Sequence, residues 1–354
     1  MYRLSALIVL STCLASSVYA QSPLPVDTVE QQLLEFLDAS AQQQWPAAES
    51  LLQSLQAQHP EFRPLKLLTT ALAGKTPVSL LPPVAITPAT DEFLEPNLRA
   101  ELYLRQLHYA APPPAGHYPK AIIRLGSHQP YVYILDQERA RLYLYANESG
   151  VLRKLADYYS GIGKQGIGKQ VRGDHRTPVG IYNFIEYLPD KALPELYGAG
   201  ALTLDFPNAW DRRLQRTGSG IWLHGVPRGT YSRTPRSSRG CATVSNFIFD
   251  ALRHHAVLNQ TPVILAARIE WQTPQQTAQQ RIVFDQLLEQ WRLQQEKQSA
   301  TPVAIQDIDM FFYPGEENLV QMNFKQSSGN TTTDKTLFWK LEDTQWKVIF
   351  EPKN

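Results

Sequence analysis

The sequence contains only two cysteines among its 354 residues, and one of them, Cys13, lies in an apolar N-terminal segment. Charged residues make up only 19% of the chain, and the net charge is +1. Such a chain has no overall electrostatic attraction to nucleic acid, so no nucleic-acid partner is predicted. Beyond the N-terminal segment no run approaches the roughly 18 apolar residues of a transmembrane helix. The 10% aromatic content excludes a chain that is disordered throughout.

The first twenty residues have the layout of a secretory signal peptide. Arg3 supplies the positive charge, residues 4–15 form a short apolar run, and residues 18–20 end in a small-x-small cleavage site. Cleavage removes one basic residue and no acidic one, so the mature chain is formally neutral. The segment therefore predicts an exported, periplasmic protein without stable membrane insertion, with an uncleaved anchor as the alternative.

The next hundred residues carry helical patterns. Apolar residues at helical spacing predict helices over 27–75, and a further helix is expected over 92–109. Residues 27–75 resemble one tetratricopeptide-type helix pair, and region 21–110 is predicted to combine these helices with a proline-rich linker over 77–93. One such pair cannot bury its own apolar face, so these helices are expected to pack on another part of the chain.

From residue 121 onward the apolar pattern changes to a period of two, which indicates strands. Strands are expected over 131–135, 140–145, 152–159, 180–187, 201–206, 220–223 and 262–269, with one helix that is capped by Thr243 or Ser245 and runs to about 258. Region 120–269 is therefore predicted to be a β-sandwich or barrel. In region 272–354, a helix over 274–297 is predicted, with Thr273 as its cap and Pro274 at its first position. Three or four strands follow it, and this α+β pattern resembles the cone-shaped, nuclear-transport-factor-like fold.

After removal of the signal peptide, Cys241 is the sole cysteine of an exported chain. Exported proteins usually pair their cysteines, so a lone one predicts a reactive thiol, with an inert buried cysteine as the alternative. His224 lies upstream, and an imidazole is the side chain suited to take the proton of a thiol. Four arginines between 226 and 240 and an expected helix start just after Cys241 predict a lowered pKa for the thiol.

Two motifs resemble those of the L,D-transpeptidase (YkuD) catalytic domain family. The first is His224-Gly225 followed, after a loop, by Ser238-x-Gly240-Cys241, and the second is the stretch 173–182, GDHRTPVGIY. The resemblance covers roughly 120–268 and implies a β-sandwich-like, mainly-β catalytic domain within a multidomain chain. It also implies Cys241 as nucleophile, His224 as base and the carbonyl of Gly225 as the group that orients the imidazole. The N–H groups of Gly240 and Cys241 would form the oxyanion hole.

The sequence departs from the family pattern at two positions near the nucleophile. Arg239 stands where the family usually has histidine, and Thr243 where it often has arginine or asparagine. Arg239, Ser238 and Trp222 are the candidate substrate-binding residues, because arginine can bind a carboxylate with two hydrogen bonds. No cofactor is predicted. No metal site is predicted either, since the adjacent His254 and His255 point in different directions on a helix.

The resemblance implies peptidoglycan stem peptides as substrate. Cys241 would attack a tetrapeptide stem and release D-Ala, and the thioester would then pass to an amine, which defines an L,D-transpeptidase. Helices before and a cone-like domain after the catalytic domain resemble the branch that includes cell-shape L,D-carboxypeptidases, in which water resolves the thioester. Release of wall-linked lipoprotein and a non-catalytic wall-binding module are further alternatives. The helical and C-terminal regions are candidate sites for protein partners.

Overall fold

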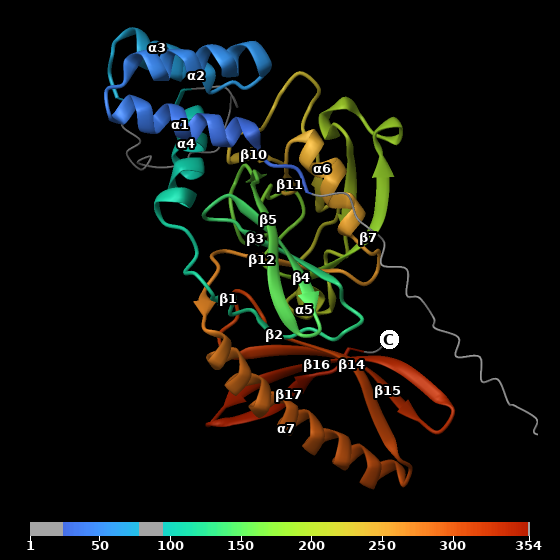
Figure 1. Ribbon diagram of the computed structural model, residues 1–354. Coiled ribbons are helices and arrows are strands. Elements are labelled where there is room, and N and C mark those ends of the chain that lie inside the picture. Colours follow the sequence, from blue (N-terminus) through green and yellow to red (C-terminus); the bar gives the residue numbers. More distant parts are fainter. Residues whose placement is uncertain (1–23, 78–94, 353–354) are drawn as a thin grey trace, which may run out of the picture.

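The computed structural model describes residues 24–77 and 95–352, which form three parts in a row (Figure 1). Helices lie at one end, a large sheet lies in the middle, and a second sheet with one long helix lies at the other end. The predicted signal peptide, and nearly all of the proline-rich segment 77–93, lie outside the described residues. Within the described ranges, none of the helices combines the length and the apolar character needed to span a bilayer.

The N-terminal part contains the helices α1 (Thr28–Ala41), α2 (Trp45–Gln58), α3 (Leu65–Ala73) and α4 (Glu95–Ala110). The N-cap of α1 is Asp27, whose side chain accepts a hydrogen bond from the N–H of Glu30 at 3.0 Å. Apolar side chains such as Phe36 and Phe62 form the core of these helices, and this core includes Tyr231 from the middle part of the chain. The helices thus bury their apolar face partly against the rest of the chain, as the sequence predicted.

The middle part is built on one eight-stranded sheet with the order β11-β9-β8-β7-β12-β3-β4-β5. Its strands are β3 (Tyr131–Asp136), β4 (Arg141–Glu148), β5 (Val151–Tyr159), β7 (Gly180–Pro189), β8 (Gly200–Leu204), β9 (Trp222–His224), β11 (Ala242–Thr243) and β12 (Pro262–Ala266). Two short strands, β6 (Ile162–Gly163) and β10 (Arg236–Ser238), pair separately in parallel.

The predicted sandwich of two sheets is a single curled sheet in the structure. The long strand β7 pairs with β12 through its first half and with β8 through its second, and a bulge at 184–186 separates the two halves. A bulge bends a strand and increases its twist, so the two ends of the sheet turn toward each other. Residues from both ends, including Leu144 and Leu223, then share one apolar core. The sequence pattern revealed the strands but not the bulge that joins the two layers.

The helix expected after Cys241 begins after Ser245, one of its two predicted caps, but is shorter than predicted. Strand β11 follows Cys241 directly, Ser245 is the N-cap, and α6 spans Asn246–Leu252. A 3-10 turn over Arg253–His255 follows instead of a helix that continues to 258. Two further 3-10 turns, Asp190–Ala192 and Glu195–Tyr197, and the short helix α5 (Ala209–Arg213) complete the middle part.

The C-terminal part consists of α7 (Pro274–Ser299) packed on an antiparallel sheet. As predicted, Thr273 caps α7 with Pro274 at its first position, and Thr273 and Gln276 form a capping box. The sheet has the order β17-β16-β15-β14-β2, from β14 (Val303–Phe312), β15 (Leu319–Ser328), β16 (Thr331–Glu342), β17 (Gln345–Phe350) and β2 (Ile122–Arg124). Strand β2 precedes the strands of the eight-stranded sheet in the sequence. The chain therefore passes through the C-terminal sheet before it enters the eight-stranded sheet.

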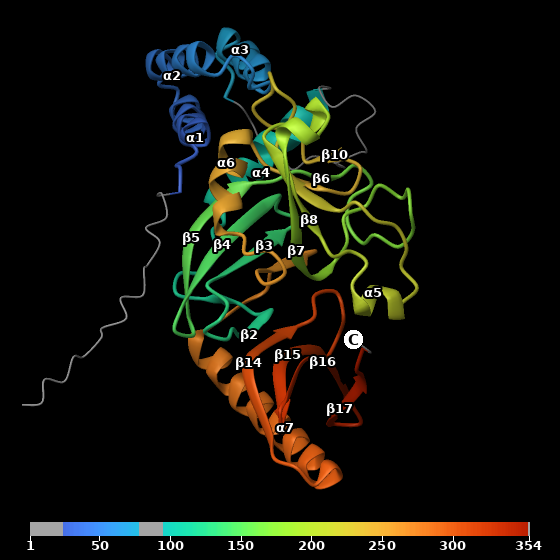
Figure 2. The same ribbon diagram turned by 90° about the vertical axis from the view of Figure 1, so that its right-hand side faces the viewer.

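Figure 2 shows the eight-stranded sheet next to the C-terminal sheet, and the two sheets meet through an apolar contact. Trp210 of α5 stacks on Phe338 of β16 with ring centroids 5.0 Å apart, and both side chains are buried. The indole N–H of Trp210 donates to Glu316 at 3.1 Å. A two-stranded pair of β1 (Tyr118–Pro119) and β13 (Trp271–Gln272) brackets the same junction. Hollows of about 720 and 780 Å³ lie beside the contact, and neither is lined by Cys241 or His224.

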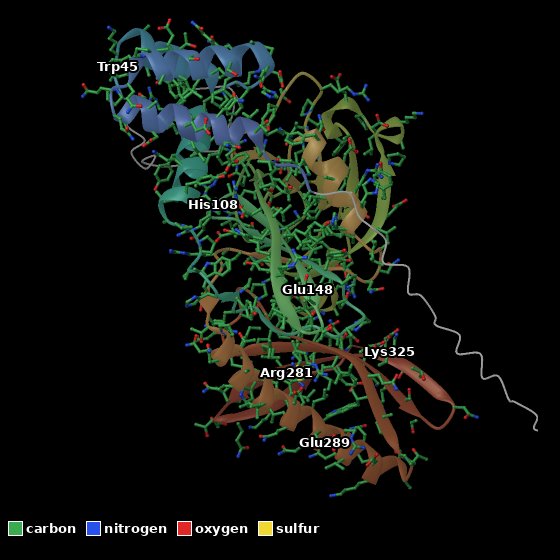
Figure 3. The ribbon with its side chains drawn as sticks, in the orientation of Figure 1. Trp45, His108, Glu148, Arg281, Glu289 and Lys325 are labelled. Atoms are coloured by element: carbon green, nitrogen blue, oxygen red, sulfur yellow. The ribbon has the colours of Figure 1, made fainter. Side chains whose placement is uncertain are left out.

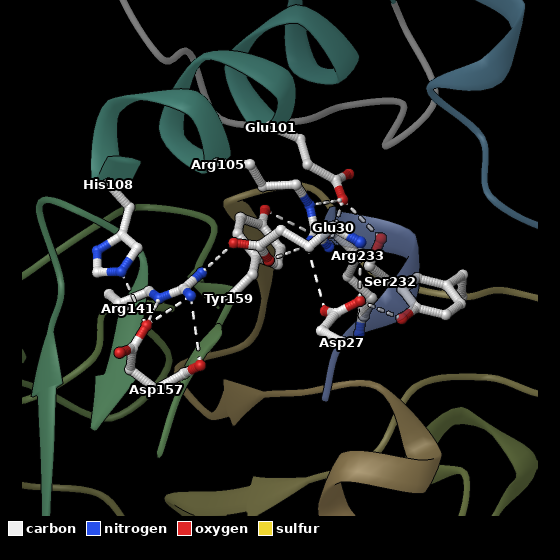
Figure 4. Close-up of polar contacts among 11 residues, drawn as sticks. Asp27, Glu30, Glu101, Arg105, His108, Arg141, Asp157, Tyr159, Ser232 and Arg233 are labelled. Carbon is white, nitrogen blue, oxygen red and sulfur yellow. Dashed lines mark hydrogen bonds and ion pairs between the residues drawn. The ribbon is translucent and has the colours of Figure 1, made fainter. Parts of the chain in front are cut away.

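A buried network of ion pairs joins the N-terminal helices to the eight-stranded sheet (Figure 4). Glu30 of α1 accepts from Arg105 of α4 at 2.6 Å and from Arg141 of β4 at 2.5 Å, and Arg141 also binds Asp157 of β5. The imidazole of His108, which lies where α4 meets the sheet (Figure 3), is 2.8 Å from Asp157. Burial opposes ionisation of Asp157, but His108 and Arg141 outweigh it and hold the pKa of that carboxyl far below its usual range.

Candidate active site

The strands β9 and β11 bring His224 and Cys241 to the same face of the sheet. The two strands are parallel neighbours, with Leu223 opposite Ala242 and His224 opposite Thr243. Side chains of paired residues point to the same face, and residues two apart on a strand share that face. Cys241 immediately precedes β11 and continues this alternation, so its thiol lies on the face of His224, beside Trp222. The strand register therefore places both residues of the sequence motif on one face of the sheet.

The ring of His224 is held in one tautomer. Its Nδ1 lies 2.6 Å from the carbonyl oxygen of Gly225, and a carbonyl can only accept, so Nδ1 carries the proton. Nε2 is therefore the basic nitrogen. The side chain is 2% exposed, and burial lowers the pKa of His224 to about 4. The ring of Tyr197 meets it edge-on, with centroids 4.9 Å apart. This arrangement keeps a neutral imidazole ready to accept a proton.

Cys241 is a buried, protonated thiol, which differs from the sequence prediction. It is 7% exposed, and its Sγ donates to the carbonyl of Gly220 at 3.4 Å. Burial raises the pKa of Cys241 to about 11, although the N–H of Trp222 and the charges of Arg233 and Lys169 act to lower it. The expected support from a helix start is missing because β11 intervenes. The sulfur contacts a polar group, the carbonyl of Gly220, and is not enclosed by aliphatic packing alone.

The carbonyl of Gly225 is held in place by Asn246. The side-chain oxygen of Asn246 accepts from the N–H groups of Ala199 and Val226 at 2.9 and 3.0 Å, and its amide donates to the carbonyl of Val226 at 2.9 Å. A Cβ on Gly225 would clash with the same oxygen, so only glycine fits here. Asn246, which the sequence did not single out, thus orients the group that orients His224.

The loop before Cys241 is closed by internal hydrogen bonds. The hydroxyl of Ser238 donates to the carbonyl of Cys241 at 2.7 Å and accepts from the N–H of Gly240 at 3.1 Å. Thr177 donates to the carbonyl of Gly240 at 2.9 Å. Ser238 is buried and engaged within the loop, so it positions Cys241 and is not a free substrate contact. The N–H of Gly240, expected to bind an oxyanion, is directed to Ser238 in this conformation.

Two predicted substrate contacts differ in exposure, since Arg239 is exposed and Trp222 is half-buried. Burial together with the charges of Lys164 and Arg239 lowers the pKa of His175, so these two cations both act on the His175 imidazole and favour its neutral form. His175 and Lys164 were not predicted as site residues, although His175 lies in the second family motif, 173–182. Among the described residues, no group of three or more His, Cys, Asp or Glu side chains could hold a metal ion.

The pKa values of His224 and Cys241 predict how the reactivity of the Cys241 thiol depends on pH. Between about pH 4 and pH 11 the imidazole is neutral and the thiol is protonated. We expect the rate of Cys241 alkylation by iodoacetamide to rise continuously from about pH 6 to pH 10, since the thiolate fraction increases about tenfold per unit below its pKa. Glutathione, measured in parallel, should level off earlier because its thiol pKa is lower. A plateau for Cys241 below pH 7 would instead indicate a thiolate–imidazolium pair.

Comparison with known proteins identifies the domain that carries this site. Residues 130–265 match the family model described as the L,D-transpeptidase catalytic domain, YkuD. This part of the chain is therefore a YkuD domain, as its two motifs predicted.

Two solved structures share the fold. Bd1075 from Bdellovibrio bacteriovorus is 23% identical with a TM-score of 0.56, and the match covers 67% of this chain and 97% of that one. The helical cell shape determining protein Pgp2 from Campylobacter jejuni is 20% identical with a TM-score of 0.54, and the match covers 66% and 95%. No curated protein matches the chain. The family model ends at 265, so the nuclear-transport-factor-like identity of the C-terminal part stays a prediction.

Proposed function

We propose that this protein is an exported, cysteine-dependent peptidoglycan L,D-transpeptidase. The observation that carries the proposal is the pairing of β9 with β11, which puts an imidazole of fixed tautomer and a lone thiol on one face of a YkuD domain. The proposed substrate is a tetrapeptide stem, whose third residue is a diamino acid and whose fourth is D-Ala.

In the first step, Nε2 of His224 takes the proton of Cys241 while Sγ attacks the carbonyl carbon of the third residue. The N–H of Cys241 is the proposed donor to the oxyanion, and that of Gly240 joins it if its bond to Ser238 opens. The tetrahedral intermediate then collapses, the bond to D-Ala breaks, and His224 protonates the leaving amine. A thioester on Cys241 remains.

In the second step, an amine from a neighbouring stem attacks the thioester carbonyl. His224 accepts the amine proton and returns it to the sulfur as the carbon–sulfur bond breaks. Arg239 is the proposed contact for a stem carboxylate, because it is exposed and lies two residues before Cys241. The positive charges of Arg239 and Lys164, which both act on His175, suit a substrate with several carboxylates.

Hydrolysis of the same thioester is the second candidate function. The order of helices, YkuD domain and α+β unit resembles the branch that includes cell-shape L,D-carboxypeptidases, and water would then replace the acceptor amine. The chemistry at Cys241 is identical up to the thioester.

Incubation of the purified protein with tetrapeptide muropeptides, followed by chromatography and mass spectrometry, separates these functions. We expect release of D-Ala and dimers joined through two third residues. Tripeptide monomers alone would overturn transpeptidation in favour of hydrolysis. An absence of D-Ala release would contradict both functions and favour a wall-binding module.

A further inference from the structure

The segment 226–237, which connects His224 to the strand before Cys241, is held by the N-terminal helices. The hydroxyl of Tyr231 donates to Asp27, the N-cap of α1, at 2.6 Å. The ring of Tyr231 lies in the apolar core of the helices, edge-on to Phe62 with centroids 5.6 Å apart. The N–H of Tyr231 also donates to the carbonyl of Glu61 at 3.4 Å. We call 226–237 the bridging segment.

A second contact anchors the bridging segment to α4. The hydroxyl of Ser232 donates to Oε1 of Glu101 at 2.6 Å, and both side chains are buried. Arg105, one turn later on α4, donates to the same oxygen at 3.1 Å and lies 3.6 Å from Asp27 (Figure 4). A single guanidinium therefore orients both carboxylates that receive the bridging segment. Burial acts to lower the pKa of Arg105, but the surrounding carboxylates outweigh it, so the side chain stays charged.

The bridging segment carries a cation to the reacting pair. The carbonyl of Arg233 accepts from Tyr159 of β5 at 3.0 Å, and its guanidinium donates to the carbonyl of Ser237 at 2.9 Å. Burial is the main cause of the pKa shifts of His224 and Cys241, and the charge of Arg233 acts on both groups. Ser238, which follows Ser237 in the chain, donates to the carbonyl of Cys241. Hydrogen bonds and the chain itself therefore connect α1 and α4 to Cys241 through the bridging segment.

We propose that Asp27, Glu101 and Arg105 are positioning residues of the active site, which hold the bridging segment and thereby set the placement of Arg233 and Cys241. The helices of the N-terminal part are then a structural component of the catalytic centre, in addition to any role in binding partners. This inference deepens the proposed function, because it concerns the same nucleophile.

Tyr231→Phe and Tyr158→Phe form a matched pair of variants. Each removes one phenolic hydroxyl that reaches the N-terminal segment, since Tyr158 donates to the carbonyl of Pro25 at 2.7 Å, but Tyr158 lies on β5 and not on the bridging segment. We expect Tyr231→Phe to lower kcat for D-Ala release about tenfold with little change in KM, because small misplacements of reacting groups cost rate rather than binding. Tyr158→Phe should leave both constants near wild type.

A second readout is independent of the muropeptide substrate. The rate of Cys241 alkylation as a function of pH should shift to higher pH in Tyr231→Phe and in Ser232→Ala, since a displaced Arg233 no longer lowers the thiol pKa. Ser232→Thr, which restores a hydroxyl for Glu101, should move the profile back toward wild type. Thermal denaturation identifies any variant that loses its fold.

Identical kinetics and identical alkylation profiles for folded Tyr231→Phe and Tyr158→Phe would overturn the positioning role. A wild-type protein that releases no D-Ala while the alkylation profile still shifts in Tyr231→Phe would overturn the proposed function alone. The two inferences therefore fail in distinguishable ways.

Discussion

A Cys241→Ala variant is expected to release no measurable D-Ala from tetrapeptide muropeptides. The substitution removes the thiol proposed as the nucleophile, and loss of a covalent nucleophile lowers the rate on the order of 10⁴-fold or more. Alanine fits the buried position without a new polar group, so the fold should persist. Intact-mass spectrometry with a carbapenem gives an independent measurement, because wild type should gain a covalent adduct and the variant should not.

His224→Gln is the companion variant for this prediction. It retains a polar side chain beside Gly225 but supplies no base, so the thiol with its raised pKa should remain protonated and nearly unreactive toward the stem. D-Ala release by Cys241→Ala at the wild-type rate would show that another group performs the chemistry. A carbapenem adduct on that variant would lead to the same conclusion.

A Glu30→Ala variant is expected to lose about 3–5 kcal/mol of unfolding free energy, which is typical when one partner of a buried ion pair is removed. Glu30 is 1% exposed and receives hydrogen bonds from both Arg105 and Arg141. Without it, two buried guanidiniums from different parts of the chain face each other with less compensating charge. Urea denaturation followed by far-UV circular dichroism measures the loss.

Glu95→Ala is the matched control, because Glu95 also pairs with an arginine, Arg99, on the same helical region. That pair is about half exposed, and solvent-exposed pairs contribute roughly 0–1 kcal/mol. Equal effects of the two substitutions would mean that the buried network does not join the helices to the sheet energetically.

The sequence alone was sufficient to predict most of the strands and to single out the residues proposed as nucleophile and base. His224, Gly225 and Cys241 were selected from two short motifs and from the absence of a second cysteine outside the predicted signal peptide. The start of α7 followed from Thr273 and Pro274, since capping is a local property that neighbouring residues determine. Such features depend on residues that are close in the chain.

Features that depend on distant residues were not predictable. Glu30, Arg105 and Arg141 form one network across more than a hundred positions, and no spacing signals it. The protonation state of Cys241 was predicted in the wrong direction, because it depends on burial and on the strand that replaces the expected helix start. The curled sheet follows from one bulge in β7, which no turn residue marks.

Because the chain passes through β2 before it enters the eight-stranded sheet, the middle and C-terminal parts cannot be separated by one cut in the chain. Strand β2 pairs with β14, and Ile122 contributes to the apolar contact between the two sheets. A shortened chain that ends at residue 265 would leave β2 without β14, the strand it pairs with, and would expose Trp210, which packs on Phe338. The YkuD domain and the C-terminal part are therefore interlaced, and removal of either exposes apolar surface of the other.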